Sequence, residues 1–205
     1  MQESTKREKW KELIFSKTLA KKSIGHKIAY IAIFAALNVA VNTFSLPLGF
    51  VQFSFTLFMS SLTGILIGPI FGFAACFLGD TVGYFIGGGS VGMFTPWMGV
   101  SMGVAAVISA LIVNGLRITL IINDMQIKGI YIKLAIVCLL TFVVCTYAIG
   151  TTAAFYLWNY KGLSYADFLG ARMALQIWNN IGNSALLFII IPILNRIKPL
   201  KIHIS

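Results

Sequence analysis

The residues of this chain that are best suited to bind a solute gather in one apolar segment near its C-terminal end. The segment "GARMALQIWNNIGNSALLF", residues 170–188, contains Arg172, Gln176, Asn179 and Asn183. Their spacing of i, i+4, i+7 and i+11 keeps them within an arc of about 60° on a helix, so they share one face. A guanidinium and three amides offer several hydrogen-bond donors and acceptors. We call these four residues the polar stripe and predict that they bind a polar solute.

The composition is that of an integral membrane protein. The chain has 205 residues, of which 58% are hydrophobic and 11% charged, and its mean hydropathy is +0.87. Soluble domains carry about 25% charged residues, so a soluble fold is excluded. Each crossing takes roughly 20 apolar residues, so this length holds five or six helices in one domain.

Glycine, proline and charged residues divide the apolar sequence into six predicted transmembrane helices. These span residues 27–46, 51–68, 69–87, 94–116, 130–158 and 170–194, with a tight turn predicted in "IGPIFG" between the second and the third. The predicted fold class is an all-α membrane protein of six crossings. It comprises a basic cytoplasmic segment (1–26), a transmembrane substrate-binding domain (27–195) and a cytoplasmic tail (196–205).

The basic residues predict the orientation of this bundle. Eight of the sixteen lysines and arginines lie in the first 27 positions. With six crossings, fourteen fall on the side of the two termini and only Lys161 and Arg172 fall on the other. The positive-inside rule therefore places both termini in the cytoplasm, and the net charge of +10 indicates topology rather than nucleic-acid binding. The polar stripe then occupies the extracellular half of the last helix.

Three further polar residues inside predicted crossings are candidates for a functional role. Asp80 is the only carboxylate among them and must face the protein interior or water, because a charge is costly in lipid. Asn38 and Asn42 lie one turn apart on the first helix. Each of the three either bonds a neighbouring helix or contacts a ligand, and both alternatives stay open.

Small and aromatic residues complete the set of candidates. A stripe of small residues on the first helix, opposite the asparagines, permits close approach of another helix; we call Ala32, Ala36 and Ala40 the alanine stripe. Trp97 and Trp158 are predicted at the outer membrane boundary. They form either part of an interfacial aromatic belt or, with Tyr84, an aromatic wall beside the polar stripe.

Several chemistries have no counterpart in the sequence. It lacks the pattern GxxxxGK[ST] of a P-loop ATPase, and its only histidines, His26 and His203, lie outside the crossings. We therefore predict no catalytic residue, no metal ligand and no cofactor. A binding subunit that docks on an energised partner fits best; a stand-alone secondary transporter or channel is the alternative, and a membrane enzyme using Asp80 is a third.

The sequence resembles the substrate-binding S components of energy-coupling factor (ECF) transporters over about residues 27–195. The resemblance rests on the basic N-terminus, the stretches "IAIFAALNVA" and "FTPWMGVSMG", and above all the pattern GPxxGFxxxFLGDxxG in "LTGILIGPIFGFAACFLGDTVGYF".

The resemblance implies a function and partners. S components capture a water-soluble vitamin from outside the cell and then associate with a transmembrane scaffold, the T component, and two cytoplasmic ATPases that use ATP. The docking surface of the family maps onto the alanine stripe. Its lid over the ligand maps onto "SLPLGFVQF", which makes Gln52 a candidate ligand contact. The expected location is a bacterial plasma membrane.

The candidate residues also favour some vitamins over others. Arg172 favours a carboxylate-bearing ligand such as folate, pantothenate, biotin or lipoate over cationic thiamine. Trp97, Trp158 and Tyr84 could stack on a planar ring, which favours folate. The chain has "FTPW" where the folate group has "FPGF". Pantothenate and cobalamin therefore stay open beside folate.

Overall fold

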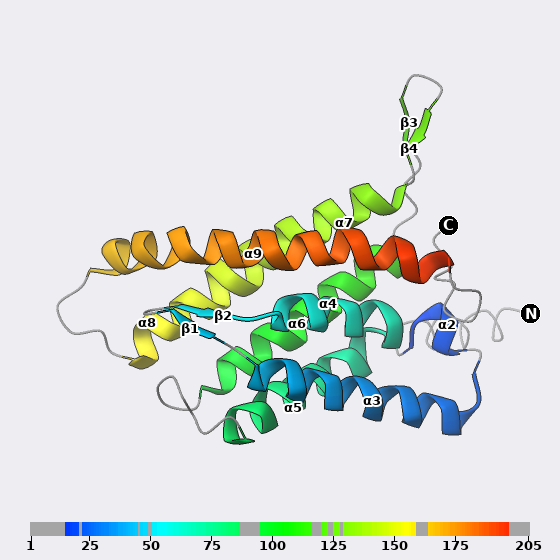
Figure 1. The fold of residues 1–205 in the computed structure, drawn as a ribbon, viewed down its shortest axis with the longest axis horizontal. Helices are drawn as coiled ribbons and strands as arrows, with labels where there is room; N and C mark the ends of the chain where they lie inside the picture. Colours follow the sequence, from blue (N-terminus) through cyan, green and yellow to red (C-terminus); the bar gives the residue numbers. More distant parts are fainter. Residues whose placement is uncertain are drawn as a thin grey trace, which may run out of the picture.

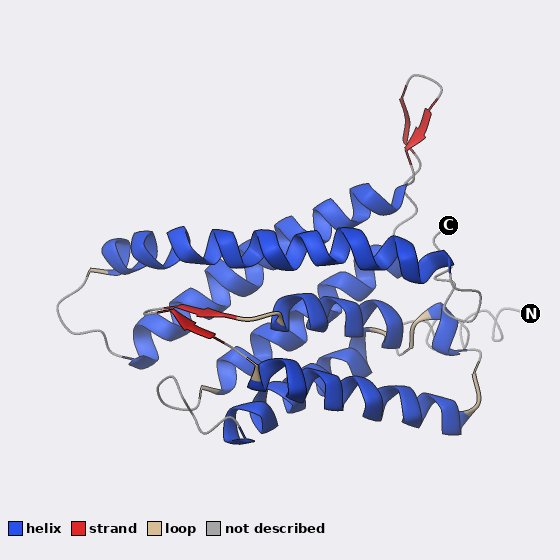
Figure 2. Ribbon diagram, viewed as in Figure 1, coloured by secondary structure: helices blue, strands red, loops and turns tan. Residues whose placement is uncertain are grey.

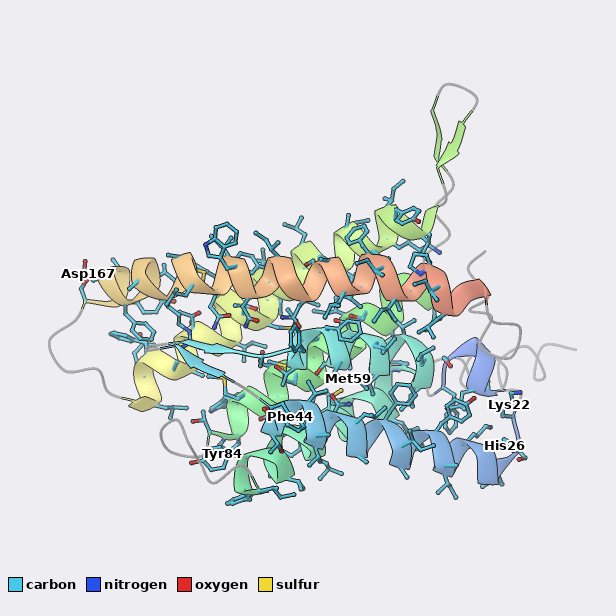
Figure 3. All side chains as sticks on the ribbon, in the orientation of Figure 1. Lys22, His26, Phe44, Met59, Tyr84 and Asp167 are labelled. Atoms are coloured by element: carbon cyan, nitrogen blue, oxygen red, sulfur yellow. The ribbon has the colours of Figure 1, made fainter. Side chains whose placement is uncertain are left out.

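The computed structural model describes residues 15–20, 22–44, 46–48, 51–86, 95–115, 120–122, 125–127, 129–158 and 164–196. Figure 1 shows a bundle whose long helices run back and forth between two ends. We call them the Lys22 end and the Asp167 end, after the residues labelled at each in Figure 3.

Helices make up nearly all of the described bundle, and the strands among the described residues form two short hairpins (Figure 2). In chain order the described elements are α2 (Lys17–Ala20), α3 (Ile24–Thr43), β1 (Leu46–Leu48), β2 (Val51–Phe53), α4 (Thr56–Ile67), α5 (Pro69–Ile86), α6 (Pro96–Gly115), β3 (Leu120–Ile122), β4 (Met125–Ile127), α7 (Gly129–Leu140), the π-helix η1 (Thr141–Thr151), α8 (Thr152–Trp158) and α9 (Tyr165–Arg196). Because α7, η1 and α8 follow one another without a break, the described chain has six helical segments besides the four-residue α2, and they follow the predicted order. The first residue of α3 and the last turn of α9 lie at the same end of the bundle (Figure 1).

Helix α4 differs from the predicted second crossing. It has 12 residues, all of them buried, and at about 1.5 Å per residue it is about 18 Å long, against roughly 30 Å of hydrocarbon core. Five other helices of the described chain, including the continuous α7–α8 rod, are long and apolar enough to cross a membrane. Hydropathy alone did not distinguish the short buried helix α4 from the membrane-spanning ones, because a helix enclosed by other helices is as apolar as one that faces lipid.

The chain before α4 is a hairpin, where the prediction had begun a helix at residue 51. Strands β1 and β2 pair antiparallel, with Leu46 opposite Phe53 and Leu48 opposite Val51. Pro47 lies in β1, where its fixed φ suits extended backbone and opposes helix. A second hairpin, β3–β4, occupies part of the connection predicted at 117–129 and projects sideways from the bundle beside the start of α7 (Figure 1).

The predicted turn in "IGPIFG" is confirmed. Gly68 separates α4 from α5 with a φ of 119°, which favours glycine, and Pro69 opens α5. The backbone of Phe15 and Ser16 packs against this turn, and the Ser16 hydroxyl donates to the Leu66 carbonyl at 2.5 Å. Part of the basic N-terminal segment therefore caps the end of α4 at the Lys22 end of the bundle.

The core lies where α4 meets α6, α7 and α9. Ile65 and Leu66 of α4 belong to one buried cluster with Val113 of α6, Leu134 of α7 and Ile191 of α9. This apolar cluster fixes the half of α9 nearer the Lys22 end. The polar half of α9 consequently projects toward the Asp167 end, beside the β1–β2 hairpin (Figure 1).

Candidate substrate-binding site

Helix α9 begins five residues earlier than the predicted start at Gly170. Ser164 caps it: its hydroxyl accepts from the Asp167 backbone N–H at 3.2 Å and donates to the Asp167 carboxylate at 2.6 Å. This reciprocal pairing resembles a capping box and contributes about 1 kcal/mol. The pattern Ser-x-x-Asp at 164–167 was visible in the sequence and would have given the right boundary.

The predicted α9 polar stripe forms one buried face of the helix. Arg172 is 7% exposed, Gln176 9% and Asn183 1%, and Asn179 is half-buried. Trp178, on the opposite side, is 71% exposed. The helical spacing therefore separated the inward residues from the outward ones correctly.

Three aromatic residues that the sequence reasoning missed lie beside this stripe. Phe155 of α8 contacts Tyr165 edge-on at 5.2 Å and Phe168 at 5.6 Å between ring centroids. Tyr165 and Phe168 precede Arg172 by seven and four positions, so they continue the same face of α9. Starting the helix at 170 had removed them from consideration. The candidate site thus has an aromatic group at the Asp167 end and polar groups next to it.

Arg172 brings a positive charge into this site. Its guanidinium carbon lies 5.9 Å from the centroid of the Phe168 ring, a distance compatible with cation–π attraction. At 7% exposure the side chain lies inside the protein, not among lipid headgroups at the surface. Such a group can donate hydrogen bonds to carbonyl, hydroxyl or carboxylate oxygens.

Asn183 joins α9 to the chain that leaves the hairpin. Its Oδ1 accepts from the Phe58 backbone N–H at 2.8 Å, and its Nδ2 donates to the Ser54 carbonyl at 2.9 Å. Nδ2 also lies 2.7 Å from the Asn179 carbonyl and 3.0 Å from Asn179 Oδ1. Both ends of this amide are thus engaged by protein groups. These contacts favour a positioning role over the ligand contact predicted for Asn183.

Asn38, Asn42 and Asp80 form a separate group, which we call the α3–α5 seam. Asn38 Nδ2 donates to Thr63 Oγ1 of α4 at 2.8 Å, and Asn42 Nδ2 donates to the Asp80 carbonyl at 2.9 Å and lies 3.2 Å from its Oδ1. Of the two alternatives left open by the sequence, these contacts favour bonding between helices. Helix α3 packs mainly on α5 and α4, whereas α9 packs mainly on α4, α7, η1 and β2, so in the described bundle the seam and the α9 polar stripe belong to different helix contacts.

Glycines allow the close approach of α3 and α5. A Cβ at Gly79 would lie 2.5 Å from Asn38 Cβ, and one at Gly83 would lie 2.8 Å from Asn42 Cβ. The face of α3 that carries the asparagines is therefore packed against α5. The alanine stripe lies on the other face and is exposed.

The remaining candidates are spread over other parts of the bundle. Tyr84, half-buried near the end of α5, meets the Phe85 ring edge-on at 5.6 Å. Trp97, in the first turn of α6, is 55% exposed, as a residue of an interfacial belt would be. The side chains of Gln52 and Trp158 lie outside the described residues, although both positions have described backbone in β2 and α8.

Comparison with known families decides what kind of protein this is. A family model described as "ECF-type riboflavin transporter, S component" matches residues 22–199, most of the chain. The chain belongs to this S component family. The resemblance found in the sequence is thereby confirmed. S components are substrate-binding subunits of vitamin transporters rather than enzymes, and this one is a multi-pass membrane protein.

A solved structure shares the fold of this S component. The crystal structure described as FolT bound with folic acid superposes with a TM-score of 0.58 and 18% sequence identity, covering 78% of this chain and 86% of the FolT chain. At this identity the likeness concerns the fold alone. A comparison with curated proteins gives no match.

Proposed function

We propose that this S component binds riboflavin and hands it to an ATP-driven partner module for uptake. The observation that carries the proposal is the family match over residues 22–199, whose description names riboflavin. Riboflavin was absent from the vitamins considered from the sequence, because Arg172 had been taken to indicate a carboxylate. A guanidinium also bonds carbonyl and hydroxyl oxygens, so a neutral ligand suits it as well.

The chemistry of the site supports this choice. Riboflavin has a flat tricyclic ring, whose uracil-like edge carries two carbonyls around an N–H, and a hydroxylated ribityl chain. The ring suits the aromatic group of Phe155, Tyr165 and Phe168, and its polar edge suits the amide of Gln176 and the guanidinium of Arg172. A site of this kind is suited to bind a planar, neutral ligand that forms hydrogen bonds.

The proposal also covers topology and partners. The basic N-terminal residues would lie in the cytoplasm of a bacterial cell and the Asp167 end outside, so that riboflavin enters from outside. The partners would be a T component and two ATPases, which alone use ATP, while this subunit needs no cofactor. The exposed alanine stripe on α3 would be the docking surface for the T component.

Titration of the purified protein with riboflavin tests the proposal. We expect saturable binding with one riboflavin per chain, seen as quenching of flavin fluorescence when the ring enters the aromatic group. An excess of folate, pantothenate or cobalamin should not displace it. Absence of riboflavin binding, or equal displacement by folate, would overturn the assignment; the second result would favour folate, the ligand of the structurally similar FolT.

Arg172→Ala should weaken riboflavin binding by about 10- to 100-fold, the scale of a hydrogen bond to a charged group. Isothermal titration in detergent measures the change. Trp178→Ala is the matched control, because this large side chain on the same helix is 71% exposed on the opposite side. Equal affinity of the Arg172 variant and the wild type would remove Arg172 from the site.

A further inference from the structure

Three amide side chains of α9 form a chain of hydrogen bonds that starts at the backbone. The Phe58 N–H donates to Asn183 Oδ1 at 2.8 Å, and Asn183 Nδ2 donates to Asn179 Oδ1 at 3.0 Å. Asn179 Nδ2 in turn faces Gln176 Oε1 at a longer 3.5 Å. We call Asn183, Asn179 and Gln176 the amide relay.

Backbone groups determine which way each amide points. The nitrogen and oxygen of an amide side chain can be exchanged by a flip, so their assignment requires partners of one kind only. The Phe58 N–H can only donate, and the Ser54 carbonyl, 2.9 Å from Asn183 Nδ2, can only accept. The Ser54 N–H can only donate and lies 3.4 Å from Asn179 Oδ1. Asn183 and Asn179 therefore each have one allowed orientation.

This orientation is passed on to Gln176. Asn179 turns its donor nitrogen toward Gln176, so the atom of Gln176 that faces it must be the acceptor, Oε1. Gln176 Nε2, with two N–H donors, then points away from the relay. No acceptor for Nε2 is found among the described residues, although the side chain is only 9% exposed. Nε2 is not among the fully buried side-chain atoms that lack a partner, so a ligand can reach this donor and accept its hydrogen bond.

We propose that Gln176 is a specificity-determining residue that donates from Nε2 to a carbonyl oxygen of the substrate, and that Asn183 and Asn179 are positioning residues that fix this direction. The inference rests on the proposed function, where the acceptor is a carbonyl on the uracil-like edge of riboflavin. A site with this polarity selects a carbonyl and disfavours an N–H or amino group at the same place.

Replacement of the carbonyl oxygen by sulfur gives a direct test, because a thiocarbonyl is a poorer acceptor of nearly the same shape. Riboflavin and its 2-thio and 4-thio analogues are titrated into the wild type and into Gln176→Leu, which lacks the donor and adds no charge. We expect the wild type to prefer riboflavin over one of the analogues by about 10-fold, the scale of one hydrogen bond. Gln176→Leu should bind riboflavin and that analogue with equal affinity.

Asn183→Asp tests the positioning role. Aspartate can still accept from the Phe58 N–H, but it turns a second acceptor toward Asn179 and so favours the flipped Asn179 amide. Only the long 3.4 Å contact of the Ser54 N–H then opposes the flip, so the direction of Gln176 is no longer fixed. The preference for oxygen over sulfur should fall toward one even though Asn183 does not touch the ligand; a merely structural role would lower thermal stability and leave this ratio unchanged. Asn180→Leu, which removes a neighbouring amide outside the relay, should keep the wild-type ratio.

The outcomes separate this inference from the function on which it rests. Riboflavin binding by the wild type, with an unchanged preference in Gln176→Leu, would overturn the relay and leave the proposed function standing. Unchanged preference in Asn183→Asp would overturn the positioning role. A wild type that does not bind riboflavin would overturn the proposed function and this inference together.

Discussion

Gly64→Ala is expected to destabilise the protein by about 3 kcal/mol or more, or to prevent its folding. Gly64 lies in the middle of α4, and an added Cβ would overlap the carbonyl group of Ala106 in α6, 2.6 Å from its carbon and 2.7 Å from Ala106 Cα. Backbone atoms of a packed helix cannot rotate aside, so α4 and α6 would have to separate. Helix α5 also approaches α4 closely here, because a Cβ added at Gly72 would lie 3.1 Å from Gly64 Cα.

The midpoint of thermal unfolding in detergent measures this effect, together with the yield of monodisperse protein. Gly170→Ala is the matched control, because an added Cβ there meets nothing within 4 Å and the position is an exposed part of α9. Alanine is the better helix former, so the control should be neutral or stabilised by up to about 1 kcal/mol. Equal midpoints of Gly64→Ala and the wild type would show that α4 and α6 do not cross this closely.

Predictions from the sequence were most accurate where the helical spacing of polar residues matches the face that is buried in the structure. The α9 polar stripe was found from spacing alone, because residues at i, i+4, i+7 and i+11 share a helix face in any packing. The turn at Gly68–Pro69 followed from the backbone preferences of two residues. The boundaries were weaker: the start of α9 at 170 hid Tyr165 and Phe168, although the capping residues Ser164 and Asp167 marked the true start.

The features that the sequence left open, or placed wrongly, depend on partners far away in the sequence. Asn38 bonds Thr63, 25 positions away, and Asn42 bonds Asp80, 38 positions away. No local pattern distinguishes such a pair from two residues that face a ligand. The short length of α4 and the π-helix from Thr141 to Thr151 are likewise settled by packing. The Ser101 hydroxyl of α6, for example, donates to the Cys145 carbonyl within that π-helix.

Ala36→Trp is expected to abolish uptake while leaving riboflavin binding unchanged. Ala36 is exposed on α3 at the centre of the alanine stripe, and Asn38 and Asn42 hold the other side of the helix against α4 and α5. An indole on this surface disturbs no described contact within the subunit. It would, however, hold any partner helix away from a surface whose small side chains permit close approach.

Two measurements on the same preparation test this separation of functions. Riboflavin affinity is measured in detergent, and accumulation is measured in liposomes that contain the partner module and ATP. Ile189→Trp, an equally bulky change at an exposed position of α9, is the control and should retain both activities. Accumulation by Ala36→Trp would remove the alanine stripe from docking, whereas loss of affinity would show that this side of α3 supports the binding site. Wild-type protein without partners should bind riboflavin but not accumulate it, and accumulation by this chain alone would instead favour a stand-alone transporter.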